Sequence, residues 1–186
     1  MITENKLLAG ALALVMVGAY VSWHHEPEAP GSTIVQLLDH SPDAVEGIEL
    51  TGPTATVAVS FFEAAGDRRA WIEVTRRGET RGFVANEAFD EQLERYAKLE
   101  AARSLGKLDE ETRAEMKLDA PERTLSITAE GETHRFELGG RTTGARDFYT
   151  RRPGEAEVVL LRGRVVNDLE SPEGRYMQRR VRAARP

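Results

Sequence analysis

Histidine is the residue type of this chain best suited to acid–base and metal chemistry near neutral pH, and four are present. His24 and His25 are adjacent, and Glu26 and Glu28 follow closely. Such a group could bind a divalent cation loosely, but a structural metal site needs three or four ligands on a rigid scaffold. Because the surrounding segment is rich in proline, we predict a spacer here and no metal site.

Another histidine lies in Asp39-His40-Ser41, which contains the three residue types of a hydrolytic triad. Consecutive residues do not readily meet as nucleophile, base and orienting acid, and no glycines of a nucleophile elbow surround the serine. The sequence Ser41-Pro42-Asp43 instead predicts a turn before the first strand. The fourth histidine, His134, shares a predicted strand face with Phe136 and Leu138, which favours a packing role over general-base catalysis.

Residues 139–146, Gly-Gly-Arg-Thr-Thr-Gly-Ala-Arg, have part of the spacing of a phosphate-binding loop. The two residues after Gly144 are Ala145 and Arg146, where such a loop needs Lys and Ser or Thr for the phosphates and magnesium. A connection between strands is therefore the better interpretation. Arg141 and Arg146 remain candidates for contact with an anionic ligand or partner.

Acidic residues are plentiful, with 31 Asp and Glu against 25 Lys and Arg, and the formal net charge is −6. Groups such as Asp109-Glu-Glu111 and Glu155 with Glu157 lie in charge-rich segments, so nothing places two carboxylates across a cleft as glycoside hydrolysis requires. Net acidity argues against nucleic acid as a partner. The absence of cysteine excludes disulfides, thiolate zinc sites, cysteine nucleophiles and lipidated cysteine anchors.

We therefore predict no catalytic, metal-ligating or cofactor-binding residue, no cofactor, and a protein that is not an enzyme. A hydrolase with an unrecognised site is the least favoured alternative.

The C-terminal residues reverse the acidic trend, because five arginines and no acid occur in the last dozen residues: Arg175, Arg179, Arg180, Arg182 and Arg185. Tyr176, Met177 and Val181 lie between them, which would suit a short amphipathic segment. One interpretation is a solvated tail, and the other is an electrostatic contact with anionic lipid headgroups or an acidic partner.

An uncharged apolar segment of seventeen residues runs from Leu7 to Trp23 and follows Lys6. A helix of this length spans about 25 Å, just under the hydrocarbon thickness of a bilayer. Lys and Arg do not recur until Arg68, so the positive-inside rule places residues 1–6 in the cytoplasm and the rest outside. We predict a single-pass anchor in the inner membrane, with a cleaved signal peptide ending near Val17-Gly18-Ala19 as the alternative.

The remaining chain is predicted to comprise a linker (24–33), one exported, periplasmic domain (34–174) and an Arg-rich tail (175–186). Ile34–Leu38 is expected to pack on the domain, and no internal repeat is visible. Alternating patterns predict strands at 45–50, 54–62, 70–75, 123–128, 133–138, 148–152 and 158–161. Turns are expected at 64–69, 76–79 and 129–132.

A helical period predicts a helix within 86–106, with Asn86 as its N-cap and Arg103 in its last turn. Two further helices are expected at Glu110–Met116 and Arg162–Leu169. These elements predict an α+β fold with a mostly antiparallel sheet and a helical insert, preceded by one transmembrane helix.

Several segments follow a recurring pattern: Trp71 through Phe89, Leu93 and Leu99 to Ala102-Arg103-Ser-Leu105, Met116-Lys-Leu-Asp-Ala-Pro121, Leu138-Gly139, Phe148-Tyr-Thr-Arg151 and Glu157-Val-Val-Leu-Leu161. Together they resemble the bacterial domain-of-unknown-function family 4340, over roughly residues 40–181. Lys117 stands where the family usually has glycine. The resemblance implies one N-terminal membrane helix and an exported α+β module, and some members are encoded beside Gld-type ABC transporter components. It implies no catalytic residues.

The leading hypothesis is therefore a membrane-anchored interaction domain, an accessory subunit of an ABC-type transport or cell-envelope assembly that contacts a permease, an ATPase or another envelope protein. The alternative is a module that binds a glycan or peptidoglycan fragment through exposed aromatic residues. Trp71 and Tyr149 are the candidates for that role, although both are expected to belong to the sheet core.

Overall fold

Short segments in which apolar and polar residues alternate produce the main element of this fold, an antiparallel sheet. The computed structural model describes residues 34–177, which belong to one compact unit, Thr33–Pro186. The predicted anchor Leu7–Trp23 and the linker 24–33 lie outside the described residues. Within residues 34–177, no helix combines the length and the apolar character that crossing a bilayer requires.

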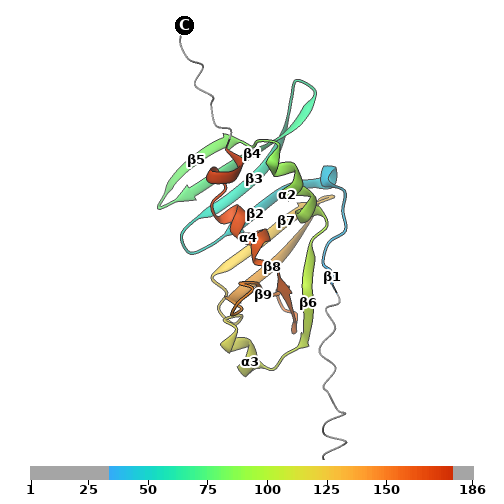
Figure 1. Ribbon diagram of the computed structural model, residues 1–186, viewed down its shortest axis with the longest axis vertical. Helices are drawn as coiled ribbons and strands as arrows, with labels where there is room; N and C mark the ends of the chain where they lie inside the picture. The colour runs from blue at the N-terminus through green and yellow to red at the C-terminus, as the bar shows by residue number, and fades with distance from the viewer. Residues whose placement is uncertain (1–33, 178–186) are drawn as a thin grey trace, which may run out of the picture. The chain divides into compact units, whose positions relative to one another are not determined.

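The sheet has ten strands among the described residues, and neighbouring strands are antiparallel throughout (Figure 1). In chain order they are β1 (Val35–Gln36), β2 (Val45–Thr51), β3 (Thr56–Ala64), β4 (Asp67–Arg76), β5 (Glu79–Val84), β6 (Glu100–Lys107), β7 (Arg123–Ala129), β8 (Glu132–Arg141), β9 (Phe148–Arg151) and β10 (Glu157–Leu161). Across the sheet they follow the order β1-β6-β10-β9-β8-β7-β2-β3-β4-β5. The sheet-dominated α+β class is thus as predicted.

Two four-stranded meanders lie side by side in this sheet, although the sequence shows no repeat. Strands β2–β5 lead into helix α2 (Ala88–Ala97), and strands β7–β10 lead into helix α4 (Gly163–Glu170). The first strands of the two meanders pair at the centre of the sheet, where Ile48 lies opposite Ile127 and Leu50 lies opposite Leu125. Helix α2 connects β5, at one edge, to β6, which pairs with β10 near the other edge.

Helices α2 and α4 lie across one face of the sheet, here called the inner face (Figure 1). A further short helix, α5 (Glu173–Tyr176), joins them, and Phe89 of α2 packs edge-on against Tyr176 with ring centroids 5.3 Å apart. The buried core beneath these helices includes Ile48, Leu50, Val57, Val59, Ile72, Val74, Leu125, Ile127, Phe136 and Leu138. Since Tyr176 is fully buried, the domain extends past the predicted boundary at residue 174.

Part of the opposite, outer face of the sheet is covered near β8, where the segment after helix α3 (Glu110–Glu115) packs against Gly139. A Cβ atom at Gly139 would lie 2.3 Å from the carbonyl oxygen of Met116, so only glycine allows this approach. Elsewhere on this face, side chains such as Glu49, Ser60 and Glu73 are exposed.

The predicted hairpins are confirmed, with longer strands and tighter turns than expected. Ala65-Gly66 connects β3 to β4, and Arg77-Gly78 connects β4 to β5. Both residues of each turn have positive φ, which matches the right-handed twist of the flanking strands and favours glycine at the second position. The predicted turn at Ser41-Pro42-Asp43 is the start of a 3-10 helix, η1 (Pro42–Ala44), with Ser41 as its N-cap.

The predicted helix within 86–106 is correct only in its first half. The N-cap position of α2 is Glu87 and not the predicted Asn86, although the Asn86 side chain accepts a hydrogen bond from Ala88 N at 3.0 Å. Helix α2 ends at Ala97, and residues 100–107 form β6. Arg103 therefore lies in a strand and not in a last helical turn. Residues 101–105 have good helix formers, but pairing with both β1 and β10 outweighs that local preference.

The other two predicted helices are confirmed as α3 and α4, and the leading segment does pack on the domain. Leu38 is buried, and β1 pairs with β6 at the edge of the sheet.

Candidate functional site

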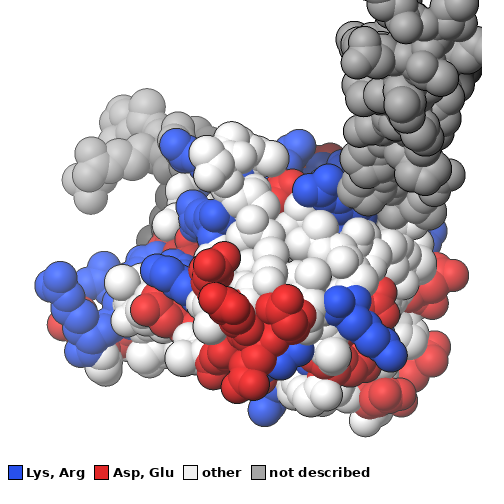
Figure 2. Space-filling view, turned by 90° about the horizontal axis from the view of Figure 1, so that it is seen from below, with Lys and Arg blue, Asp and Glu red and all other residues white. Residues whose placement is uncertain are grey.

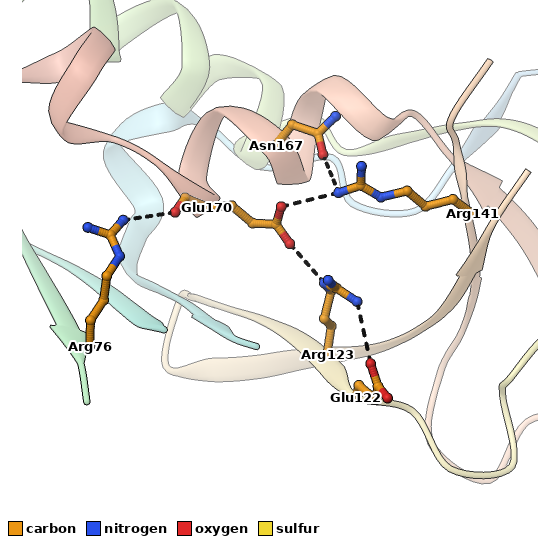
Figure 3. Close-up of polar contacts among 6 residues, drawn as sticks. All are labelled: Arg76, Glu122, Arg123, Arg141, Asn167 and Glu170. Atoms are coloured by element: carbon orange, nitrogen blue, oxygen red, sulfur yellow. Dashed lines mark hydrogen bonds and ion pairs between the residues drawn. The ribbon is translucent and has the colours of Figure 1, made fainter. Parts of the chain in front are cut away.

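An arginine-rich cluster surrounds the C-terminal end of α4, with Glu170 at its centre (Figure 3). Arg123 Nε donates to Glu170 Oε1 at 2.8 Å, and Arg141 Nη2 donates to Glu170 Oε2 at 3.2 Å. Arg141 also donates to Asn167 Oδ1 at 2.8 Å, and Arg76 donates to the Glu170 carbonyl oxygen at 3.2 Å. These five residues are called the Glu170 cluster below.

Arg141, a predicted anion contact, is thus held within the fold. Its guanidinium also lies over the ring of Phe148, 4.7 Å from the centroid, and its side chain is 37% exposed. Arg146 is exposed in the turn after β8, and within residues 34–177 its side chain has no ion pair or hydrogen bond. The structure does not join the two arginines into one anion site, because Arg141 is committed to Glu170.

A hollow of about 720 Å³ adjoins the cluster, between β4, β5 and α5, and Arg76, Arg77, Arg81, Glu79 and Glu173 contribute to its lining. Burial alone would raise the pKa of Glu173, but the hydrogen bonds and positive charge of Arg76 outweigh burial and lower it. Glu173 is therefore an ionised carboxylate that pairs with Arg76. Arg81, in the same lining, is largely exposed and lies beside Glu79.

The Arg-rich tail is described only at its start. Arg175 belongs to α5, and its Nη1 lies 2.8 Å from Asp168 Oδ2, an ion pair that ties α5 to α4. Arg179, Arg180 and Arg182 lie outside the described residues. Arg175 thus has a structural contact within the domain, while the rest of the predicted interaction segment stays a prediction.

A buried polar group connects α2 with α4. Tyr96 Oη donates to the Val165 carbonyl oxygen at 2.7 Å, and Gln92 Nε2 donates to the same oxygen at 3.3 Å. The neighbouring Tyr176 Oη is also buried but has no hydrogen-bond partner within residues 34–177. Burial raises the pKa of Tyr96 far above its usual range and, together with the Asp168 carboxylate, raises that of Tyr176 to about 12. Both phenols are therefore neutral and poorly suited to act as bases.

The structure pairs two histidines that the sequence analysis treated separately. The rings of His40 and His134 have centroids 5.4 Å apart, and each Nδ1 faces a glutamate, Glu130 at 3.6 Å and Glu132 at 3.7 Å. Within the described residues, no group of three or more His, Cys, Asp or Glu side chains is arranged to hold a metal ion. No pattern in the sequence signals this pair, because it depends on how the loop before β2 packs against β8.

The acidic groups considered for catalysis have local structural contacts. Asp109 Oδ1 accepts a hydrogen bond from Thr112 N at 2.7 Å, which caps α3. Hydrogen bonding by the Thr112 side chain, together with this backbone hydrogen bond, lowers the pKa of Asp109. Glu157 accepts a hydrogen bond from Ser104 Oγ at 2.9 Å. Seen from the α3 end, acidic side chains crowd this surface (Figure 2), as expected for solvated charge.

The outer sheet face holds the aromatic residue that the sequence analysis assigned to the core. Trp71 is only partly buried, and its indole covers Gly82 of the adjacent strand, where a Cβ atom would lie 2.2 Å from Trp71 Cζ2. Trp71 Nε1 donates to Glu73 Oε1 at 3.1 Å, and Phe62 nearby on β3 is 39% exposed. The expectation that Trp71 belongs to the sheet core is therefore wrong.

Tyr149 is likewise only partly buried, so it is not part of the core either. It lies on β9, and β8, β7, β2 and β3 separate that strand from β4, which carries Trp71. At about 4.8 Å per strand, the two residues are too far apart to line one groove. Between them is a shallow depression of about 310 Å³ whose lining includes Ser126, Thr128 and Arg135.

No family model, curated protein or solved structure matches the chain. The assignment of function therefore depends on the contacts and exposed surfaces described above.

Proposed function

We propose that this protein is a membrane-anchored interaction domain that uses the outer face of its sheet to bind a protein of the cell envelope. The observation that carries the proposal is the partly exposed Trp71 on a sheet face that helices leave largely uncovered. Tryptophan combines a large contact area with a polar N–H and is enriched at the centres of binding surfaces. Ala58 on the neighbouring strand β3 has a small side chain, which would let a partner approach the sheet closely there.

The apolar segment Leu7–Trp23 supports a place for this domain in the inner membrane, with residues 1–6 in the cytoplasm and the sheet domain in the periplasm. The resemblance to family 4340 supports a more specific partner, the permease or ATPase of an ABC-type transporter. In this proposal the protein is an accessory subunit: the anchor holds it in the bilayer, and the outer sheet face contacts the assembly.

Site-specific photocrosslinking in native membranes tests the proposal. A photoreactive residue replaces Ser60 on the outer face, and a matched variant carries it at Glu94, an exposed position on α2. Adducts with an envelope protein are expected from position 60 and not from position 94, and mass spectrometry would identify them. Equal adducts from both positions, or from an unrelated single-span protein, would argue against a specific outer-face partner.

The anchor is tested separately. Replacing Leu7–Trp23 with another membrane anchor should leave the domain folded, because the Thr33–Pro186 unit forms its own core. If that unit expressed alone failed to fold, the picture of one anchor and one independent domain would be wrong.

A glycan or peptidoglycan fragment is the second candidate ligand, and the partly exposed indole of Trp71 favours it as well. Sugar rings stack on exposed aromatic faces, and Glu73 beside the indole could accept a hydroxyl hydrogen bond. Saturable retention on isolated cell wall, lost in Trp71→Ala while the circular dichroism spectrum stays unchanged, would favour this ligand over a protein.

A further inference from the structure

A hollow of about 590 Å³ lies between η1, the β3–β4 hairpin and helix α2, and it is called the α2 groove below. Volumes of about 300–1,000 Å³ are typical of sites that hold a small molecule. The hairpin contributes Phe61 and Ala70, which pack with the core on the inner face of the sheet. The α2 groove is therefore separate from the outer face, which carries Trp71.

The buried part of the lining is apolar. It consists of Ala70 of β4 and of Phe89 and Leu93 of α2, each at most 9% exposed. Phe61 of β3 lies beside them and is only partly buried, so part of its ring surface is open to the groove. An apolar lining of this kind would bind the hydrocarbon part of a ligand.

Among the lining residues in the described part of the chain, Arg68 is the one cation. Its guanidinium lies 3.9 Å from the centroid of the Phe61 ring. It also donates to the carbonyl oxygens of Pro42, at 3.0 Å, and Val45. Arg68 is thus committed to holding the hairpin against η1, and its charge lies on one wall of the groove.

Four exposed carboxylates belong to the same lining: Asp43, Asp90, Glu91 and Glu94. Two of them have a cation nearby, because Glu91 pairs with Arg95 and Asp43 Oδ1 lies 4.0 Å from Arg68 Nη1. Within residues 34–177, Asp90 and Glu94 have no ion pair. The groove therefore has an excess of negative charge next to its apolar lining.

Asp90 and Glu94 are four residues apart on α2, so their side chains are neighbours on one side of the helix. Like charges at this spacing destabilise a helix. The helix dipole favours Asp90 in the first turn, but its effect does not extend to Glu94. A cation bound between the two carboxylates would remove their repulsion.

We propose that the α2 groove binds a small organic cation, an ammonium group on an aromatic or aliphatic body. The body contacts Phe61 and Leu93, and the ammonium pairs with Asp90 and Glu94 through charge-assisted hydrogen bonds. Because η1, the hairpin and α2 bound the hollow, it suits a small molecule better than a long protein segment. An anion of the same shape would meet two carboxylates that have no counter-charge.

NMR titration of the full-length chain in a nonionic detergent tests the preference for a cation. The probes are naphthylmethylammonium and naphthylacetate, which have the same aromatic body and opposite charges. The amide signals of Phe89 and Leu93 report binding in the groove. The ammonium should bind roughly tenfold more tightly than the carboxylate. Equal affinities, or no shift of these signals with the ammonium, would overturn the proposal.

Paired variants test whether the two α2 carboxylates hold the ammonium. Asp90→Asn with Glu94→Gln should raise the Kd of naphthylmethylammonium by roughly fivefold or more and leave the circular dichroism spectrum unchanged. Glu110→Gln with Glu111→Gln is the matched control, because it removes the same charge from exposed positions on α3. An equal rise in both pairs would reduce the binding to general attraction by an acidic protein and overturn the proposal.

The photocrosslinking experiment described above tests the class of the occupant independently of the outer face. A small cation in the groove predicts no protein adducts from position 94, whether or not position 60 forms them. Protein adducts from position 94 that are absent in the unrelated single-span protein would assign the groove to a protein segment and overturn the proposal.

Discussion

Glu170 and Arg123 are 47 residues apart in the chain, yet Arg123 Nε donates to Glu170 Oε1 at 2.8 Å. The same carboxylate accepts from Arg141 at 3.2 Å, so one side chain of α4 holds arginines from both β7 and β8. The two arginines in turn flank Phe148 of β9. The Glu170 cluster therefore holds α4 against the second meander, strands β7–β10.

Substitution Glu170→Gln should weaken the hydrogen bonds to Arg123 and Arg141 and lower the free energy of unfolding by about 1–2 kcal/mol. Hydrogen bonds to a charged group contribute more than neutral ones, but the partial exposure of all three side chains reduces the effect. Urea unfolding of the Thr33–Pro186 unit measures the change. Glu79→Gln is the control, because its pair with Arg81 is mostly exposed and should contribute less than about 0.5 kcal/mol. Equal losses in the two variants would contradict the stabilising role of Glu170.

The two buried tyrosines should respond differently to loss of their hydroxyl groups. Tyr96→Phe removes a hydrogen bond to the Val165 carbonyl oxygen and should cost about 1 kcal/mol. Tyr176→Phe removes a buried hydroxyl that has no partner among residues 34–177, so it should be neutral or slightly stabilising. Urea midpoints at neutral pH compare the two variants, and a larger loss for Tyr176→Phe would show that its hydroxyl has a partner.

Local signals in the sequence were sufficient for the hairpins but not for the assembly of the sheet. An Ala-Gly or Arg-Gly turn between alternating segments specifies its own hairpin, because the two strands are neighbours in the chain. The central pairing of β2 with β7 depends on residues far apart, and nothing local specifies it. Residues 100–107 show the same limit, because their strand conformation is fixed by β1 and β10 and not by their own preference.

The candidate site was partly predictable. Ala70, Ile72 and Val74 alternate along β4 toward the core, so the sequence already placed Trp71 on the opposite face, and the core assignment overlooked that signal. The role of Arg141 was not predictable, because its partner Glu170 is reached only when α4 folds back over the sheet.

Alkaline pH should destabilise the protein through Tyr176. Its pKa is raised from the ordinary 10.0 to about 12 in the folded state, so the folded protein keeps a proton that the unfolded chain releases. The stabilisation is complete below about pH 10 and is lost as the pH rises through the folded pKa. Between about pH 10 and about pH 12, the free energy of unfolding should fall in both proteins. The fall should be smaller in Tyr176→Phe than in the unsubstituted protein, by on the order of 2 kcal/mol. Parallel curves for the two proteins would show that Tyr176 ionises equally well in the folded state.

Trp71 and Gly82 should behave as a coupled pair, because the indole occupies the space above the glycine. In Gly82→Ala the new methyl group would lie 2.2 Å from Cζ2 and 2.7 Å from Cε2 of the indole, so the ring must move. The cost should be about 1–3 kcal/mol, as for other overpacked sites. Gly47→Ala is the matched control on β2, since its Cβ would meet only Val59 O at 3.6 Å, an ordinary contact.

A double-mutant cycle separates this clash from the loss of the glycine itself. Once Trp71→Ala has removed the ring, Gly82→Ala should cost little or stabilise slightly, because alanine restricts the unfolded chain more than glycine does. The coupling free energy between the two positions should therefore exceed about 1 kcal/mol. Strictly additive effects would mean that the indole does not lie over Gly82 in solution, and the aromatic surface assigned to the outer sheet face would lose its geometric basis.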